Sequence, residues 1–159
     1  MIQRIQSLYL LCVVIIHAAL NFVPLWEGSG PNGQNVIVDI QNVRHFHDNS
    51  QEMAFTQESM WLTGLNWLIV ILGIITIFLY KKRLRQLRLS RLLAVASSGF
   101  IALQFYIIEM AKSLFTSGID ESSYEFGAFL PIAGLILIVL AGMAILRDER
   151  LVRSADRLR

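Results

Sequence analysis

Residues 81–91, KKRLRQLRLSR, lie between two long apolar stretches, 61–80 and 92–108, and decide how the chain is arranged. Six of these eleven residues are Lys or Arg, and none is Asp or Glu. A short basic segment flanked in this way is typical of a cytoplasmic loop that joins two membrane-spanning helices. Because spans alternate in direction, placing this loop in the cytoplasm fixes the side of every other segment.

Four apolar stretches have the length that a membrane span needs, which is about 20 residues for roughly 30 Å of hydrocarbon. They cover residues 5–25, 61–80, 92–108 and 128–146. The first exceeds a usual signal-peptide core and no A-x-A site follows it, so we interpret it as a retained helix. The composition agrees, because only 16% of the residues are charged against about 25% in soluble domains. We therefore predict an all-α fold, a left-handed bundle of four antiparallel transmembrane helices that forms one domain over residues 1–159.

The longest connection, residues 26–60, is expected to fold over the outer end of the bundle. After Trp26, which we expect to be an interfacial anchor, the segment EGSGPNGQN is rich in Gly, Asn and Pro and predicts turns. The β-branched segment 36–40, VIVDI, predicts a short strand. We expect the polar segment 46–59 to form a surface helix that leads into the second span.

Charge is strongly partitioned along the chain. Residues 1–6, 81–91 and 147–159 hold 12 of the 14 basic residues, whereas the remainder holds nine of the 12 acidic ones. This alternation predicts that both termini are cytoplasmic, and it argues against nucleic-acid binding, whose basic residues would not change side with each apolar span. The tail 147–159 is expected to be a basic amphipathic helix. Basic residues of the loop and tail either only set the topology or also contact lipid headgroups or a partner: Lys81, Lys82, Arg83, Arg85, Arg88, Arg91, Arg150, Arg153 and Arg157.

Polar residues inside the predicted spans form a possible intramembrane site, because such residues are costly in lipid and often functional. His17 and Asn21 lie one turn apart on one helix face, and Gln104 and Glu109 lie in the third span. The alternative is structural. A neutral His17 would then bond to a neighbouring helix, and Glu109 would pair with Lys112 at the outer interface.

A stripe of small residues, Gly127, Gly134 and Ala141, recurs every seven residues in the fourth span. Such a stripe lets another helix approach closely. The neighbour is either another helix of this chain, which we favour, or a helix of a partner.

Chemistry-bearing motifs are scarce. His45 and His47 would share a face of a strand and could hold zinc or copper, although a solvated loop is the stronger interpretation. The single cysteine, Cys12, excludes an internal disulfide and a Cys-based zinc site. No hydrolase, P-loop or metalloprotease motif is present. We therefore predict no catalytic residues, no metal and no cofactor.

Four segments carry a resemblance to a known family: MIQRIQSLYLL at the start, KKRLRQLRLSRL in the middle, FGAFLPIAGLILIVLAGMAI in the fourth span and RDERLVRSADRLR at the end. Together they resemble a family of small four-span proteins of the bacterial inner membrane, catalogued as a domain of unknown function. The resemblance implies an architecture and a membrane but no activity. The long first outer loop with a strand is also similar to claudin-like folds, although the cysteine pair of the claudin loop is missing.

The function expected from the sequence is not enzymatic. We expect a scaffold, an assembly factor or an accessory subunit whose partners are membrane lipids and other inner-membrane subunits. The alternative is a protein that binds or transports a small molecule or lipid through His17, Asn21 and Gln104. A haem or quinone subunit is a third class, but a single intramembrane histidine does not make a bis-histidine haem site. An enclosed polar cavity at mid-membrane would favour transport, and a filled core would favour the accessory subunit.

Overall fold

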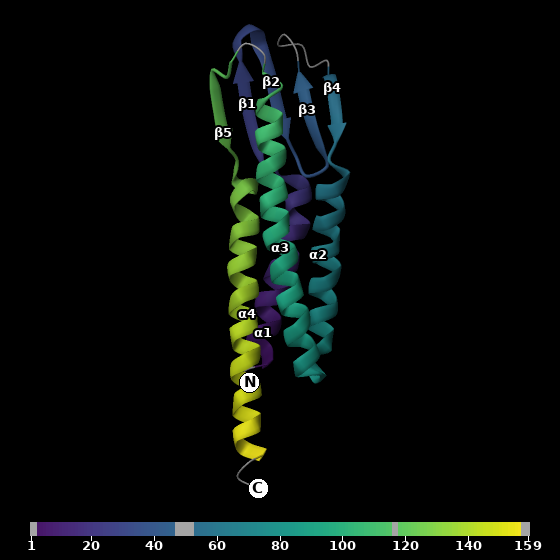
Figure 1. The fold of residues 1–159 in the computed structure, drawn as a ribbon, viewed down its shortest axis with the longest axis vertical. Helices are drawn as coiled ribbons and strands as arrows, with labels where there is room; N and C mark the ends of the chain where they lie inside the picture. The colour runs from purple at the N-terminus through teal and green to yellow at the C-terminus, as the bar shows by residue number, and fades with distance from the viewer. Residues whose placement is uncertain (1–2, 47–52, 116–117, 157–159) are drawn as a thin grey trace.

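The computed structural model describes residues 3–46, 53–115 and 118–156 and shows a helix bundle capped at one end by a sheet (Figure 1). All four helices are long and apolar enough to cross a membrane. The four predicted spans are thus confirmed as helices, and the chain is a membrane protein. The helices are α1 (Gln3–Ala19), α2 (Met60–Phe78), α3 (Arg83–Lys112) and α4 (Phe126–Asp156).

The sheet makes the predicted all-α fold class wrong, because it is much more than a short strand in a loop. Five antiparallel strands pair in the order β4-β3-β2-β1-β5. Four come from the 26–60 connection, and the fifth comes from the connection between α3 and α4. They are β1 (Trp26–Gly30), β2 (Gln34–Val38), β3 (Asn42–Phe46), β4 (Met53–Glu58) and β5 (Glu121–Tyr124).

Two local predictions about the 26–60 connection also fail. The glycine-rich start was expected to form turns, but residues 26–30 form β1, and only Pro31–Gly33 turn the chain into β2. The expected surface helix within 46–59 is replaced over Met53–Glu58 by β4, which pairs with β3. The reason is the same in both cases, because a neighbouring strand supplies the backbone hydrogen bonds that a short polar segment cannot supply to itself.

The basic segment 81–91 is mostly helix and not loop. A short 3₁₀ turn, Leu79–Lys81, follows α2 directly, and α3 begins at Arg83. Arg, Leu and Gln are good helix formers and the segment contains no Gly or Pro, so nothing in it stops the helix. In α4 the predicted helical tail is continuous with the fourth span as far as Asp156.

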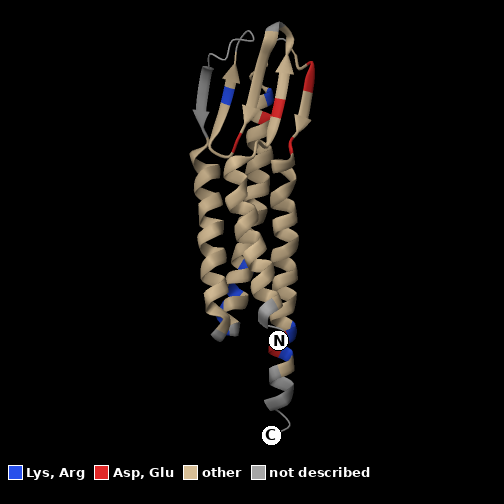
Figure 2. Cartoon of the chain, turned by 180° about the vertical axis from the view of Figure 1, so that it is seen from behind, with Lys and Arg blue, Asp and Glu red and all other residues tan. Residues whose placement is uncertain are grey.

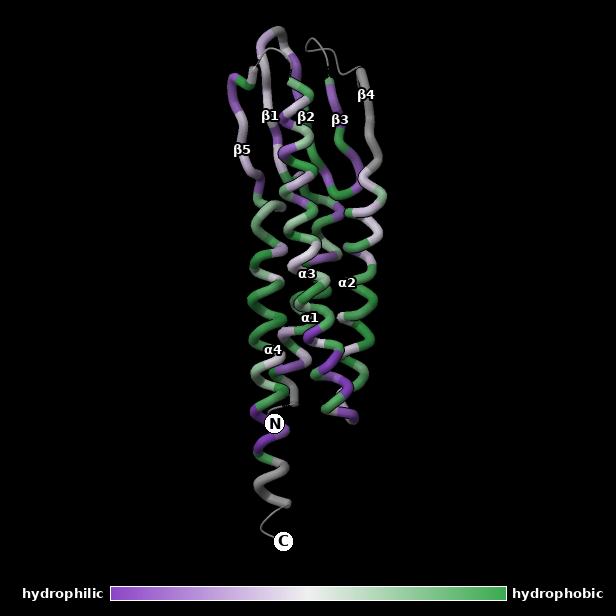
Figure 3. The backbone as a smooth tube through the Cα atoms, viewed as in Figure 1, coloured by the Kyte–Doolittle hydropathy of each residue, from purple (hydrophilic) through white to green (hydrophobic). Residues whose placement is uncertain are grey.

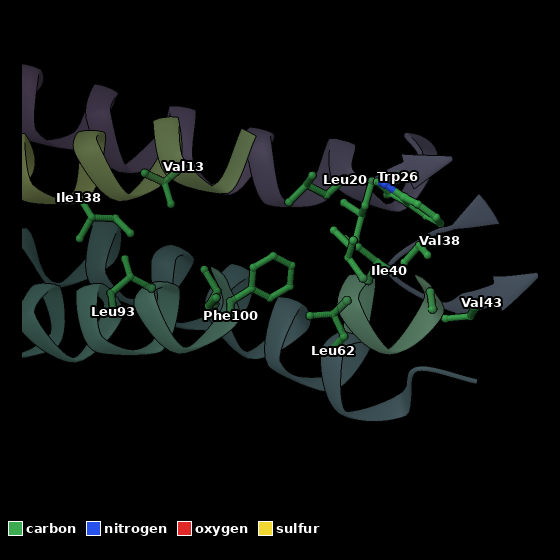
Figure 4. Packing of buried hydrophobic residues seen from close by; sticks show 14 of the residues in the cluster. Val13, Leu20, Trp26, Val38, Ile40, Val43, Leu62, Leu93, Phe100 and Ile138 are labelled. Carbon is green, nitrogen blue, oxygen red and sulfur yellow. The ribbon is translucent and has the colours of Figure 1, made fainter. Parts of the chain in front are cut away.

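The sheet is fixed to the bundle by one long helix. With 30 residues, α3 is about 45 Å long, and its last turns run alongside the sheet (Figure 1). Just beyond them, Phe115 makes an edge-to-face contact with Trp26 of β1, with ring centroids 6.3 Å apart. A Cβ atom at Gly28 or Gly30 would collide with these rings, so both glycines are needed for the sheet to approach. The buried core therefore continues without a break from the helices into one face of the sheet (Figure 4).

The two ends of the molecule differ in charge and hydropathy. Acidic residues gather on the sheet, whereas most of the Lys and Arg residues lie at the opposite end of the helices (Figure 2). We call these the sheet end and the basic end. Between them the helices are largely hydrophobic (Figure 3).

Candidate functional site

Buried polar side chains inside the bundle are the strongest candidates for function, because each one needs a partner when water is absent. Eight polar residues of the described helices are almost completely buried: Gln6, His17, Asn66, Thr76, Gln86, Ser90, Ser97 and Gln104. Four of them carry side-chain amides that can donate two hydrogen bonds. If these N–H donors bond to other helices, the amides are structural; if they are free, the amides could bind a ligand.

Each of the four amides reaches across to a backbone carbonyl of a neighbouring helix. Gln6 Nε2 of α1 donates to the carbonyl of Ala144 in α4 at 3.1 Å. Gln104 Nε2 of α3 donates to Ala128, also in α4, at 3.1 Å. These bonds join α4 to α1 near the basic end and to α3 near the sheet end.

The other two amides join the remaining neighbours. Gln86 Nε2 of α3 donates to the carbonyl of Thr76, in the last turn of α2, at 3.2 Å. Asn66 Nδ2 of α2 donates to the carbonyl of His17, near the end of α1, at 3.0 Å. Carbonyls in the last turn of a helix lack a partner within that helix, so these two amides also satisfy helix ends. Every pair of adjacent helices is thus joined by one such bond, and we call Gln6, Asn66, Gln86 and Gln104 the amide clamps.

The Asn66 clamp differs from the other three because the His17 side chain also forms a hydrogen bond with Asn66. His17 Nδ1 lies 2.9 Å from Asn66 Oδ1. Since Asn66 already donates from Nδ2, its oxygen is the acceptor, and the imidazole carries its proton on Nδ1. The ring also packs edge to face on Phe100 of α3, with centroids 5.5 Å apart, and its Nε2 would lie 3.4 Å from a Cβ atom at Gly134 of α4. Around His17 all four helices therefore meet.

The predicted intramembrane site is not assembled by the fold. Asn21 donates to the carbonyl of Ala18, one turn back in its own segment, at 3.0 Å. Glu109 is exposed and pairs with Lys112 at 3.0 Å. Gln104 is hydrogen-bonded to α4 and His17 to α2. The four residues therefore have separate partners and do not line one space.

Three of the amide clamps were missed from the sequence. Asn66 stands alone in the apolar stretch 61–80, and an isolated amide in such a stretch is a signal that could have been used. Gln6 and Gln86 each lie within two residues of an arginine, and for that reason they look like ordinary polar residues at the ends of spans.

The small-residue stripe of α4 faces into the bundle. A Cβ atom at Gly127 would lie 2.3 Å from the Pro24 carbonyl oxygen, and one at Gly134 would touch His17. Ala141 is fully buried. The structure therefore places the stripe on the side of α4 that contacts the N-terminal segment of the same chain.

Basic residues at the basic end are spread over the outside of two helices. Arg85, Arg88 and Arg91 are exposed and lie on successive turns of α3, with Lys82 exposed just before it. Arg150 is exposed on α4 and, together with Arg147 and three apolar residues, borders a shallow surface hollow. Arg157 lies outside the described residues, as do the side chains of Lys81, Arg83 and Arg153.

A metal site at the histidine pair receives no support from the residues that can be located. His45 lies on β3 opposite Val36 of β2, while His47 is outside the described residues. Across residues 3–46, 53–115 and 118–156, no three His, Cys, Asp or Glu side chains gather closely enough to hold an ion.

Comparison with known proteins identifies a family but no activity. No curated protein matches the chain. The family described as a domain of unknown function, DUF4293, matches residues 2–158, which is nearly the whole chain. This four-helix protein with its sheet cap therefore belongs to the DUF4293 family.

Proposed function

We propose that this protein is a non-catalytic accessory subunit or assembly factor of the bacterial inner membrane. In this proposal the bundle is a rigid anchor, and the sheet is the surface that holds a partner outside the cytoplasm. The observation that carries the proposal is the set of amide clamps. Side-chain amides that bind a ligand need donors that are free to meet it, whereas these four amides each donate to the backbone of a neighbouring helix.

The clamps favour a rigid anchor for an energetic reason. Interhelical hydrogen bonds in membranes are worth about 0.6 kcal/mol each on average, so one bond alone does little. Here at least one such bond lies at each of the four interfaces, and around them apolar side chains such as Leu93, Phe100 and Ile138 fill the bundle (Figure 4). A sliding movement of any helix past its neighbour would break a clamp and leave a buried amide without a partner.

Charge supports the location and the orientation. Positive residues favour the cytoplasmic side of a bacterial inner membrane. The basic end, with both chain termini, is therefore the cytoplasmic end in this proposal, and the sheet lies on the other side.

The sheet offers a partner a polar, exposed face. Burial alternates along β1, and Glu27 and Ser29 lie on its less buried side, away from the bundle. Ser123 and Glu121 of β5 pair with them and therefore point the same way. The edge strand β5 is exposed throughout. A strand with a free edge can pair with a strand of another protein, and the flanking side chains then select the partner.

Site-specific photo-crosslinking in cells tests this proposal. A crosslinking amino acid at Ser123 of β5, which shares the exposed face with Glu27, should capture one defined membrane or periplasmic protein, identified by mass spectrometry. The matched control is the same amino acid at Val139, which is exposed on the apolar surface of α4 and should yield no such product. The proposal fails if the crosslinker at Ser123 captures nothing reproducible while the variant protein is folded and inserted.

A further inference from the structure

A hollow of about 200 Å³ lies at the sheet end between α2, α3 and β3. Its walls are mainly apolar and include Val43 of β3 and Leu103 and Ile107 of α3. Trp61 and Tyr106 stand at its rim and are 85% and 67% exposed. Because Trp and Tyr collect where hydrocarbon meets the headgroups, the hollow opens sideways at the level of the outer membrane interface.

A buried polar side chain, that of Ser59, belongs to the wall of this hollow. Ser59 lines the hollow and is only 8% exposed. It occupies the N-cap position of α2, but its side chain makes no capping hydrogen bond. A serine at this position normally accepts a bond from the first turn of its helix. Because the Ser59 hydroxyl makes no capping bond, it can donate into the hollow, beside a helix N-terminus whose first N–H groups lack partners within the helix.

The size and the polarity of the hollow indicate which kind of molecule can bind in it. Pockets that enclose a whole small molecule measure about 300–1,000 Å³, so 200 Å³ suits one chain of a larger molecule that remains partly outside. Leu103, Ile107 and Met110 line it along α3, and residues spaced in this way extend for about 10 Å. The polar group of the occupant must be a hydrogen-bond acceptor. It should also be uncharged, because the sheet end is acidic (Figure 2).

From these features we infer that the hollow binds one acyl chain of a glycerophospholipid, and that Ser59 donates a hydrogen bond to the ester carbonyl of that lipid. The ester group of a phospholipid lies at the boundary between hydrocarbon and headgroup, which is the level of Trp61 and Ser59. The acyl chain then follows Ile107 and Leu103 toward the middle of the bilayer. This site is separate from the exposed sheet face to which we assign a protein partner.

Binding of a synthetic lipid to the purified protein tests the site. The probe is palmitoyl-oleoyl-phosphatidylethanolamine, added to delipidated protein in mild detergent and measured by native mass spectrometry. Ser59→Ala removes the donor and should weaken binding about two- to tenfold, as the loss of one hydrogen bond implies. Ser98→Ala is the matched control, because Ser98 is exposed and bonds to the Ala94 carbonyl in its own helix.

Filling the hollow tests the acyl chain. Ile107→Trp should reduce lipid retention at least tenfold, whereas Ile136→Trp on the exposed surface of α4 should leave it unchanged. The dialkyl-ether analogue of the lipid lacks the carbonyl oxygen, so the native protein should bind it as weakly as Ser59→Ala binds the ester lipid. Equal binding of ester and ether lipids by the native protein would overturn the carbonyl contact, and equal retention by native and Ile107→Trp proteins would overturn the site. If Ile107→Trp fails to fold, the ether analogue still decides.

Discussion

Replacing Asn66 by leucine should be the most damaging single change among the amide clamps. Asn66 makes two hydrogen bonds with His17, at 3.0 and 2.9 Å, whereas each of the other clamps makes one across its interface. Interhelical hydrogen bonds in membranes contribute about 0.6 kcal/mol on average and up to about 1.7. The loss of two of them therefore predicts a decrease of about 1–3 kcal/mol in the free energy of unfolding. Leucine has the same branching and the same number of side-chain heavy atoms as asparagine, with methyl groups in place of the amide atoms, so the change leaves no cavity.

Reversible unfolding in mixed micelles, followed by circular dichroism, measures this free energy. The double variant His17→Phe/Asn66→Leu provides a sharper test. Phenylalanine keeps a ring against Phe100 and Gly134 but has no nitrogen that could be left without a partner. Removing both partners should therefore cost less than the two single changes together. Strictly additive effects, or an Asn66→Leu protein as stable as the native one, would refute the reciprocal bond.

Three further predictions follow from other parts of the molecule. Gly127→Ala should destabilise the bundle by about 1–3 kcal/mol, because its Cβ would lie 2.3 Å from a backbone oxygen. The control Gly64→Ala, whose Cβ would meet open space, should be neutral or stabilise the protein by up to about 1 kcal/mol. Equal melting temperatures for the two variants would contradict this prediction. Deleting residues 151–159 should leave the free energy of unfolding within about 0.5 kcal/mol while weakening co-sedimentation with anionic vesicles, and a melted bundle would show that the tail belongs to the core. In a cysteine-free background, Ser122→Cys should react with an impermeant maleimide in intact cells and Arg88→Cys should not; the reverse pattern would invert the proposed topology.

The helices could be predicted from the sequence because a membrane span depends on a local property. An apolar stretch of sufficient length satisfies its own backbone and needs no distant partner. The exact extent of α3 was missed for a related reason. The arginines at its start mark the edge of the membrane, but they do not end a helix, since they are good helix formers.

The sheet could not be derived in the same way, because its strands are defined by partners far away in the chain. Glu27 of β1 pairs with Ser123 of β5, and no local pattern connects these two residues. In β1 the glycines look like turn residues, yet they are present because Trp26 and Phe115 occupy the space that a side chain would need. The partner of His17 could not be predicted for a similar reason, since its pairing with Asn66 depends on the rotation of two helices.

The pairing of β1 with β5 also imposes an order on biogenesis. Ribosomes deliver the N-terminal part of a chain first, so in the proposed topology β1 to β4 reach the far side of the membrane before β5 has been synthesised. Until α3 has crossed the membrane and residues 121–124 have followed, the incomplete sheet exposes the unpaired edge of Trp26–Gly30. Trp26 also lacks its contact with Phe115 at this stage. An open edge of this kind readily captures other strands. The last strand to be synthesised, β5, therefore completes the sheet. The nascent chain that still lacks β5 is the form that most needs a chaperone.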